Sequence, residues 1–448
     1  MRSFFQRVLP KALQASTAAP ATPAPIAAES TPGALTARRP LMSSSGEIAG
    51  FEFRIDSQVQ CALTEGGDTD AQAAHVAAIL VGARLVAMTG RVSLARVPAA
   101  WLVHASVPRS ESGILLGVEF DPAAPMAPGP RQAVVEMMRK FKAAGALLAW
   151  DAYEDLGPDI GAVPDYLLVR PATQPISELV ESLGERPEVL KSIPVIATDL
   201  ASIEDLELAV LGGIAFVSGD MTNSRQVRSA EWVRLPPEAG RLTQLVGQLA
   251  SGADTAVIVN EIKGNIGVSF RLLQRMNSPA FAHLGGVASI DQAVAMLGRN
   301  ELHRWLSLML MQFASRRKLG SALQEIALWR SRLVELLAIE RGEHEPGRFF
   351  TLGLASMLGL ILKISPAEVA AALCLSPEAE QALLAQSGPW WVYLRTAMQV
   401  ESKVEDEAGA VVDGFSSTER VLELSAEAWR WAAENSLSDS EAKSPPAA

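Results

Sequence analysis

Cysteine and long uncharged hydrophobic runs are scarce in this sequence of 448 residues. The two cysteines, Cys61 and Cys374, lie far apart and show no metal-ligand spacing. This excludes a disulfide-stapled scaffold and a zinc knuckle, and it favours reduced thiols. The longest uncharged apolar stretch, 349–362, has 14 residues, fewer than the roughly 18 that a membrane span needs. We therefore expect a cytoplasmic protein without a membrane span.

An excess of basic residues is also missing. Lys and Arg number 39 against 50 Asp and Glu, which gives a formal net charge of −11 at pH 7. Such a balance disfavours a surface that follows nucleic-acid phosphates. A basic triplet at 316–318 and the short helix pair 296–305 leave DNA binding as an alternative, but the apolar stripe on the second helix argues against it. We predict no nucleic-acid partner.

Hydrophobic residues make up 49% of the chain and charged residues 20%, so most of it must fold. The length suggests roughly two or three domains. Residues 1–45 are the exception, because from Gln14 onward they are almost entirely Ala, Pro, Thr and Ser, without apolar periodicity. We predict a disordered leader over 1–45 and a second disordered tail over 435–448.

Between residues 46 and 235, short apolar runs alternate with helical patterns. The runs are too short for helices and lack strict alternation, which is typical of strands buried on both faces of a parallel sheet. The predicted strands are 47–54, 100–106, 114–120, 145–151, 166–170, 194–199 and 214–219. The spacing predicts an α/β fold, a (β/α) barrel, with an open doubly wound sheet as the alternative.

After Pro236-Pro237 the strand pattern stops, and 236–434 reads as an all-α domain. In the segment 300–313, which we expect Asn300 to cap, apolar residues recur every three or four positions. This stripe predicts a buried helix face and includes Leu302, Trp305, Leu306, Met309, Leu310 and Phe313.

Two segments of this domain carry a resemblance to a family. They are SFRLLQRMNSPAF at 269–281 and SIDQAVAMLGRNELHRWLSLMLM at 289–311. They resemble the signature of HDOD domains, and a weaker match extends through 349–373 to WRWAAEN at 429–435. The related HD phosphohydrolases would place their metal-binding His-Asp pair at Ser356-Met357, which cannot hold a divalent cation. The resemblance therefore implies a helical domain without a metal.

The preceding barrel resembles a degenerate EAL domain, the barrel of cyclic di-GMP phosphodiesterases. The resemblance rests on strand order and on GFEFR at 50–54 and AGALLAWDAY at 144–153. It implies four vestigial ligand-binding positions: Glu52 for the first residue of the Glu-Ala-Leu triplet, His104 for an asparagine after the second strand, Glu119 for a glutamate of the third, and Asp151 for one of two paired aspartates. Gly117 is an equally good match for the third-strand position.

Several family positions hold residues that cannot do the family's chemistry. Trp150 replaces the other aspartate, and the expected Lys, Glu and Gln fall on Leu168, Thr198 and Ser218. Phosphodiester hydrolysis by two metal ions needs several carboxylates converging on the cations. We therefore predict no catalytic residues, no metal, no cofactor and no enzyme activity.

The function that this pattern predicts is non-catalytic. We expect a signal-transduction or scaffold protein that contacts other signalling proteins in bacterial cyclic di-GMP-related regulation. The alternative is a sensor whose barrel binds cyclic di-GMP without hydrolysing it.

Overall fold

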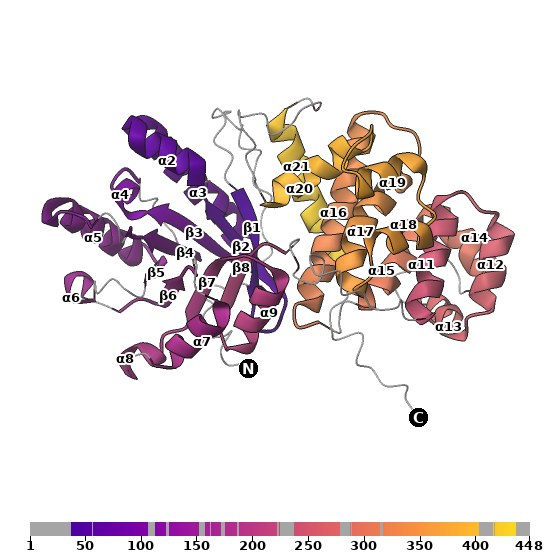
Figure 1. The fold of residues 1–448 in the computed structure, drawn as a ribbon, viewed down its shortest axis with the longest axis horizontal. Helices are drawn as coiled ribbons and strands as arrows, with labels where there is room; N and C mark the ends of the chain where they lie inside the picture. The colour runs from indigo at the N-terminus through magenta and orange to yellow at the C-terminus, as the bar shows by residue number, and fades with distance from the viewer. Residues whose placement is uncertain are drawn as a thin grey trace, which may run out of the picture. The chain divides into compact units, whose positions relative to one another are not determined.

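The computed structural model divides into two compact units (Figure 1). The first, called here the barrel unit, ends at Asp220 and also includes residues 401–402, and the second, called the helical unit, begins at Met221. The structure describes residues 37–55, 57–105, 113–121, 125–151, 157–161, 163–171, 175–185, 188–221, 224, 237–277, 287, 289–313, 317–402, 415 and 417–435.

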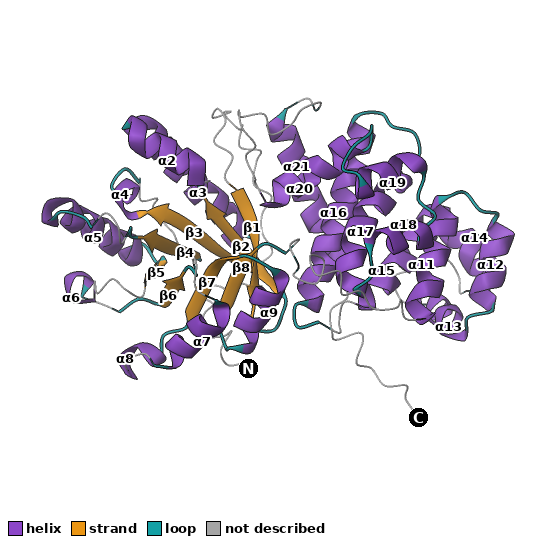
Figure 2. Ribbon diagram, viewed as in Figure 1, coloured by secondary structure: helices purple, strands orange, loops and turns teal. Residues whose placement is uncertain are grey.

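Eight strands close the barrel in sequence order. They are β1 (Ala37–Ser43), β2 (Ile48–Arg54), β3 (Val92–Pro98), β4 (Ile114–Glu119), β5 (Leu147–Asp151), β6 (Tyr166–Val169), β7 (Val195–Leu200) and β8 (Phe216–Gly219). Strand β1 is antiparallel to both its neighbours, β2 and β8, and the other neighbouring pairs are parallel. Every strand that the structure describes lies in this unit (Figure 2). The predicted α/β barrel is confirmed, and the open doubly wound sheet is wrong.

Helices cover the outside of the barrel. They are α2 (Ser57–Gly66), α3 (Thr69–Ala87), α4 (Ala99–Leu102), α5 (Pro128–Ala143), α6 (Gly157–Ile160), α7 (Ile176–Gly184), α8 (Glu188–Lys191) and α9 (Ile203–Leu211). The Ser202 hydroxyl accepts a hydrogen bond from the Asp205 amide at 3.3 Å and so caps α9. Helix α3 is long and apolar enough to cross a membrane by length and composition alone.

Two expectations about the barrel need correction. Strand β1 lies inside the segment 1–45 that was predicted as a disordered leader; Leu41 and Met42 within it are fully buried. The predicted leader over 1–36 lies outside the described residues. The predicted strand 100–106 is also wrong, because the strand is β3 and the apolar run after it forms α4, which buries Trp101 and Leu102. The charged residue Arg96 lies within β3, so this strand does not show the continuous apolar run by which the other strands were predicted.

The helical unit contains α11 (Pro237–Ala250), α12 (Thr255–Lys263), α13 (Ile266–Met276), α14 (Ile290–Leu297), α15 (Arg299–Met311), α16 (Gly320–Glu340), α17 (Pro346–Leu362), α18 (Pro366–Ala372), α19 (Pro377–Leu384), α20 (Trp391–Ser402) and α21 (Thr418–Asn435). Helix α16 is the centre of this unit and packs against α17 and α21. The Trp329 ring stacks on that of Trp429, with centroids 4.9 Å apart.

Helix α15 carries the predicted apolar stripe. Five of its six residues are buried, which confirms that part of the predicted core face: Leu302, Trp305, Leu306, Met309 and Leu310. Phe313, the sixth, lies beyond the end of α15 at Met311 and is half-buried. The predicted cap is wrong, because α15 starts at Arg299 directly after Gly298. That glycine has a φ of 76°, a left-handed conformation that glycine adopts without steric cost, and it ends α14 and starts α15 without a side-chain cap.

Candidate ligand-binding site at the barrel mouth

Charged side chains from several strands meet at one end of the barrel. Glu52 comes from β2, Glu119 from the end of β4 and Asp151 from the end of β5. The structure adds Arg96 from β3 and Asp199 from β7. The carboxyl ends of parallel barrel strands lie on the same rim, where barrel enzymes carry their active sites. This rim, called the barrel mouth below, is the position that the sequence resemblance assigned to metal and substrate.

Arg96 lies at the centre of the barrel mouth. Its side chain is 4% exposed and forms ion pairs with the fully buried Glu52, with Glu119 and with Asp199. Its Nε donates to Glu119 Oε1 at 2.7 Å, and its Nη2 lies 2.9 Å from Asp199 Oδ2. Burial disfavours the positive charge, but Glu119, Glu52 and Asp199 outweigh it and raise the pKa of Arg96 well above its usual value. The guanidinium therefore stays charged at every relevant pH.

Asp199 forms ion pairs with three arginines. Besides Arg96, Arg54 Nη1 donates to its Oδ1 at 2.7 Å and Arg39 Nη1 at 3.1 Å. Burial alone would raise the pKa of Asp199, but Arg96, Arg54 and Arg39 lower it to about 2. The backbone φ of Asp199 is 60°, in the left-handed region that non-glycine residues rarely adopt. The chain at this position is thus held in an unfavourable conformation that points its carboxylate at the arginines.

The remaining carboxylates are also engaged. Ser218 Oγ donates to Glu52 Oε2. The Arg170 guanidinium lies 3.5 Å from a Glu119 oxygen and 3.9 Å from an Asp151 oxygen. Each of the four carboxylates at the barrel mouth therefore faces an arginine, and their charges balance.

A divalent cation does not fit this arrangement. Two metal ions would need the free carboxylates of Glu52, Glu119 and Asp151 that the resemblance assigns to ligand positions. Instead, Arg96 forms ion pairs with Glu52 and Glu119, and the Arg170 guanidinium lies 3.9 Å from Asp151. In the part of the chain that the structure describes, no three His, Cys, Asp or Glu side chains are placed to hold a metal ion. The carboxylates that the sequence resemblance implies as metal ligands are thus neutralised by arginine side chains.

The four predicted site residues are not all brought together. Glu52, Glu119 and Asp151 lie at the barrel mouth, whereas His104 follows α4, beyond the end of β3. The charged residue on the second parallel strand is Arg96, which takes the place that the sequence argument gave to His104. Gly117 lies within β4, where an added Cβ would come 3.2 Å from Leu94 Cδ1, and Glu119 is the last residue of that strand.

The substituted family positions are buried. Leu168 belongs to an apolar cluster inside the barrel with Leu94 and Ile196, and Thr198 and Ser218 are fully buried. In the helical unit, the position expected for the His-Asp pair holds Ser356, whose hydroxyl accepts a hydrogen bond at 3.1 Å from the almost fully buried Arg330. An arginine thus lies at each of the two positions where the sequence resemblance would place a metal ion.

Sequence reasoning missed Arg96 and the role of Asp199. The available signal was a charged residue inside an otherwise apolar strand, as in VSLARVP and VIATDL. Such a residue is rarely buried without a partner of opposite charge.

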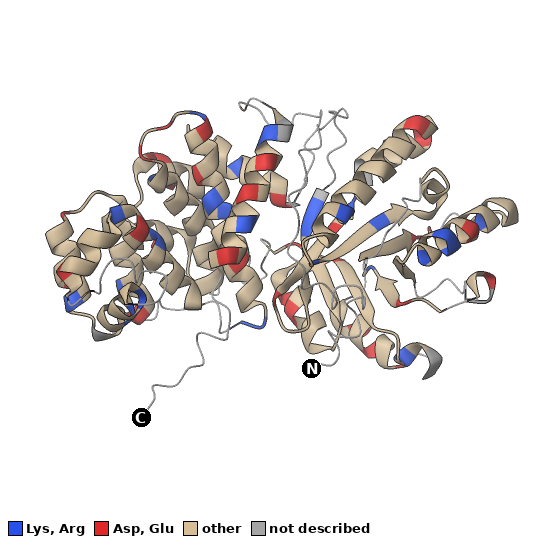
Figure 3. Ribbon diagram, turned by 180° about the vertical axis from the view of Figure 1, so that it is seen from behind, with Lys and Arg blue, Asp and Glu red and all other residues tan. Residues whose placement is uncertain are grey.

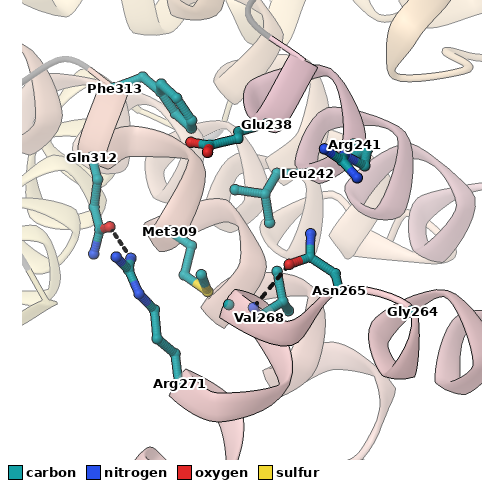
Figure 4. Close-up of a pocket in the computed structure, with 11 residues that line it drawn as sticks. Glu238, Arg241, Leu242, Gly264, Asn265, Val268, Arg271, Met309, Gln312 and Phe313 are labelled. Atoms are coloured by element: carbon teal, nitrogen blue, oxygen red, sulfur yellow. Dashed lines mark hydrogen bonds between the residues drawn. The ribbon is translucent and has the colours of Figure 1, made fainter.

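A cavity of about 640 Å³, called the helical cavity below, lies in the helical unit (Figure 4). Its apolar floor consists of Leu242, Val268 and Met309, all buried. Arg241 from α11 and Arg271 from α13 line its sides, and Arg271 donates to the Gln312 side chain. Glu238 and Phe313 lie along the upper edge in this view, and Asn265 caps α13. The lining suits a partner with an apolar group flanked by an acidic one.

A family model for the HDOD domain matches residues 234–386. These residues form an HDOD domain. The match covers the helical cavity and Trp305, and it confirms the HDOD resemblance of 269–281 and 289–311.

Other proteins resemble longer parts of the chain at low sequence identity. The uncharacterized protein YuxH of Bacillus subtilis is 24% identical over 333 residues, 72% of this chain and 80% of YuxH. Among solved structures, the Bacillus subtilis YKUI protein, with an EAL domain and in complex with substrate c-di-GMP and calcium, is 12% identical with a TM-score of 0.29, over 41% of this chain and 53% of that one. An HDOD domain protein of unknown function from Geobacter sulfurreducens is 15% identical with a TM-score of 0.29, over 49% and 91%. The strand pairing, rather than these TM-scores, defines the barrel.

Proposed function

We propose that this chain is a non-catalytic signalling protein in bacterial cyclic di-GMP-related regulation, with a degenerate EAL barrel and an HDOD domain that binds other signalling proteins. The observation that carries the proposal is the Arg96 guanidinium among Glu52, Glu119 and Asp199. A cation entering this site would meet a fixed positive charge and carboxylates already paired with it. The barrel mouth therefore offers no binding site for the two metal ions that hydrolysis would need.

The loss of substrate-holding groups supports the same proposal. Leu168 lies in the barrel core where the family resemblance expects a lysine, and Thr198 and Ser218 are fully buried. Without these contacts, a barrel that binds cyclic di-GMP as a sensor is the less favoured alternative. Exposed free thiols at Cys61 and Cys374 agree with a reducing compartment such as the cytoplasm.

The helical cavity is the contact site that we assign to a partner protein. Its apolar floor is enclosed by helices, whereas Arg241 is exposed and makes no hydrogen bond or ion pair with any residue that the structure describes. Interfaces favour arginine beside buried apolar pockets, because the guanidinium can pair with an acidic group while its stem packs. We expect a partner segment with an apolar and an acidic side chain.

Two measurements on the full chain test the proposal. Incubation with cyclic di-GMP and Mg²⁺ or Mn²⁺ should yield no linear dinucleotide by chromatography, beside an active EAL phosphodiesterase as positive control. Product that scales with the amount of protein and disappears in Glu52→Ala would contradict the proposal. Calorimetric titration with cyclic di-GMP separates the alternatives, since binding without product would favour the sensor.

A further inference from the structure

Helix α3 exposes an unusual apolar face. Its inner side packs on β2 and β3 through buried residues such as Val76 and Ile79. On its outer side Val81 is 59% exposed and Leu85 is 61% exposed, and the capping residue Met88 is 76% exposed. The spacing of four and three residues places these three side chains on one helix face. Exposed apolar faces of this kind mark interaction sites.

Helix α3 contains few charged residues. Asp70 and Arg84 are the only Asp, Glu, Lys or Arg residues in the helix, so α3 carries few coloured positions in Figure 3. Both are exposed, and neither makes an ion pair or hydrogen bond through its side chain with any described residue. They lie 14 positions apart, about 21 Å along the axis at about 1.5 Å per residue, and within about 40° of each other around the helix.

This face is complementary to itself. A twofold axis at Ala77, midway between Asp70 and Arg84, pairs two copies of α3 antiparallel, so that each aspartate meets the arginine of the other copy. The same axis places Val81 at the level of the small Ala73 of the other copy, while Ala77 lets the two helices approach closely. The charges and the side-chain sizes therefore agree on one register. A parallel pairing would instead place like charges side by side.

We propose that the exposed face of α3 is a self-association surface, on which two copies of this chain pair antiparallel about Ala77. A twofold contact of one surface with itself is the commonest way in which soluble proteins form dimers. A single helix pair buries less than the roughly 1,600 Å² of a standard stable interface, so the dimer is reversible. A membrane surface is the less suitable occupant, because interfacial helices carry Lys and Arg along their polar face.

Sedimentation of the full chain over a concentration series tests this surface. The wild type should show a reversible monomer–dimer equilibrium, and Leu85→Glu should raise the dimer dissociation constant at least about tenfold. The matched control is Leu211→Glu on α9, because Leu211 is also 61% exposed. It should leave the dissociation constant unchanged.

Charge exchange tests the register. Asp70→Arg and Arg84→Asp should each weaken the dimer, because each places like charges together at both symmetric contacts, and the double variant should restore it. Circular dichroism on each variant separates loss of the helix from loss of the contact. A wild type that stays monomeric, a double variant that stays weak with its helix intact, or an equal effect of Leu211→Glu would overturn the proposal. The proposal would also be overturned if the monomer bound anionic lipid vesicles and Leu85→Glu abolished that binding.

Discussion

The barrel mouth and the helical cavity both gather arginines, but in different ways. At the barrel mouth, Arg96 is buried and ion-paired with three carboxylates. In the helical cavity Arg241 is exposed beside an apolar floor and has no partner among the described residues. A buried, fully paired charge contributes to folding and has nothing left for a ligand, whereas an exposed, unpaired one can bind at little cost to stability. We therefore expect the barrel mouth to stabilise the fold, and we propose the helical cavity as the recognition site.

The largest expected effect comes from removing the central cation. Arg96→Ala leaves Glu52 buried without its guanidinium partner, and breaking a buried pair in this way typically costs about 3–5 kcal/mol. Urea denaturation should show this loss. Arg139→Ala, on an exposed pair with Glu136, should change the free energy of unfolding by no more than about 0.5 kcal/mol. Equal small losses in both variants would mean that the cluster at the barrel mouth is not structural.

The HDOD domain should lose stability in acid before the barrel does. Burial lowers the pKa of His303 to about 4, with help from Arg304 and Arg299. His303 is therefore neutral in the folded state, and the stability this provides is present above about pH 6.5 and is lost as the pH falls toward 4. The loss is about 3 kcal/mol at 1.36 kcal/mol per pKa unit. His303→Gln should flatten the pH dependence of HDOD unfolding between pH 6.5 and 4, as monitored by tryptophan fluorescence.

The barrel mouth should respond only at lower pH. The pKa of Asp199 is lowered to about 2 by its arginines, so its contribution is present above about pH 4 and is lost as the pH falls toward 2. The expected loss is about 2 kcal/mol. Asp199→Asn should remove that part of the acid dependence and leave the profile above pH 4.5 unchanged. A wild-type barrel that unfolds together with the HDOD domain near pH 5 would contradict the ordering.

The smallest effect on stability is expected in the helical cavity. Arg241→Glu should change the free energy of unfolding by less than about 0.5 kcal/mol, because the side chain is exposed. It should nevertheless reduce recovery of the partner in quantitative affinity purification from the native organism. Arg241→Lys, which keeps the charge, is the control and should retain more of the partner. Undiminished recovery with Arg241→Glu would remove the cavity from the proposed contact.

Periodicity in the sequence was enough to predict much of the fold. The stripe of Leu302, Trp305 and Leu306 predicted the buried face of α15, and the short apolar runs predicted most of the barrel strands. These patterns are local, because a helix or strand repeats its buried side every three to four or every two residues. The same local rule failed where a buried charge broke the pattern, as Arg96 did in β3.

Only the tertiary structure decided the chemistry of the barrel mouth. Arg39 and Asp199 are 160 positions apart, and Arg96 and Glu52 are 44 apart. Whether such residues meet depends on barrel closure and strand register, which no local pattern records. The sequence by itself predicted, through the EAL resemblance, that most metal-ligand positions are substituted. That an arginine pairs with the remaining carboxylates followed from the folding of distant strands onto one rim.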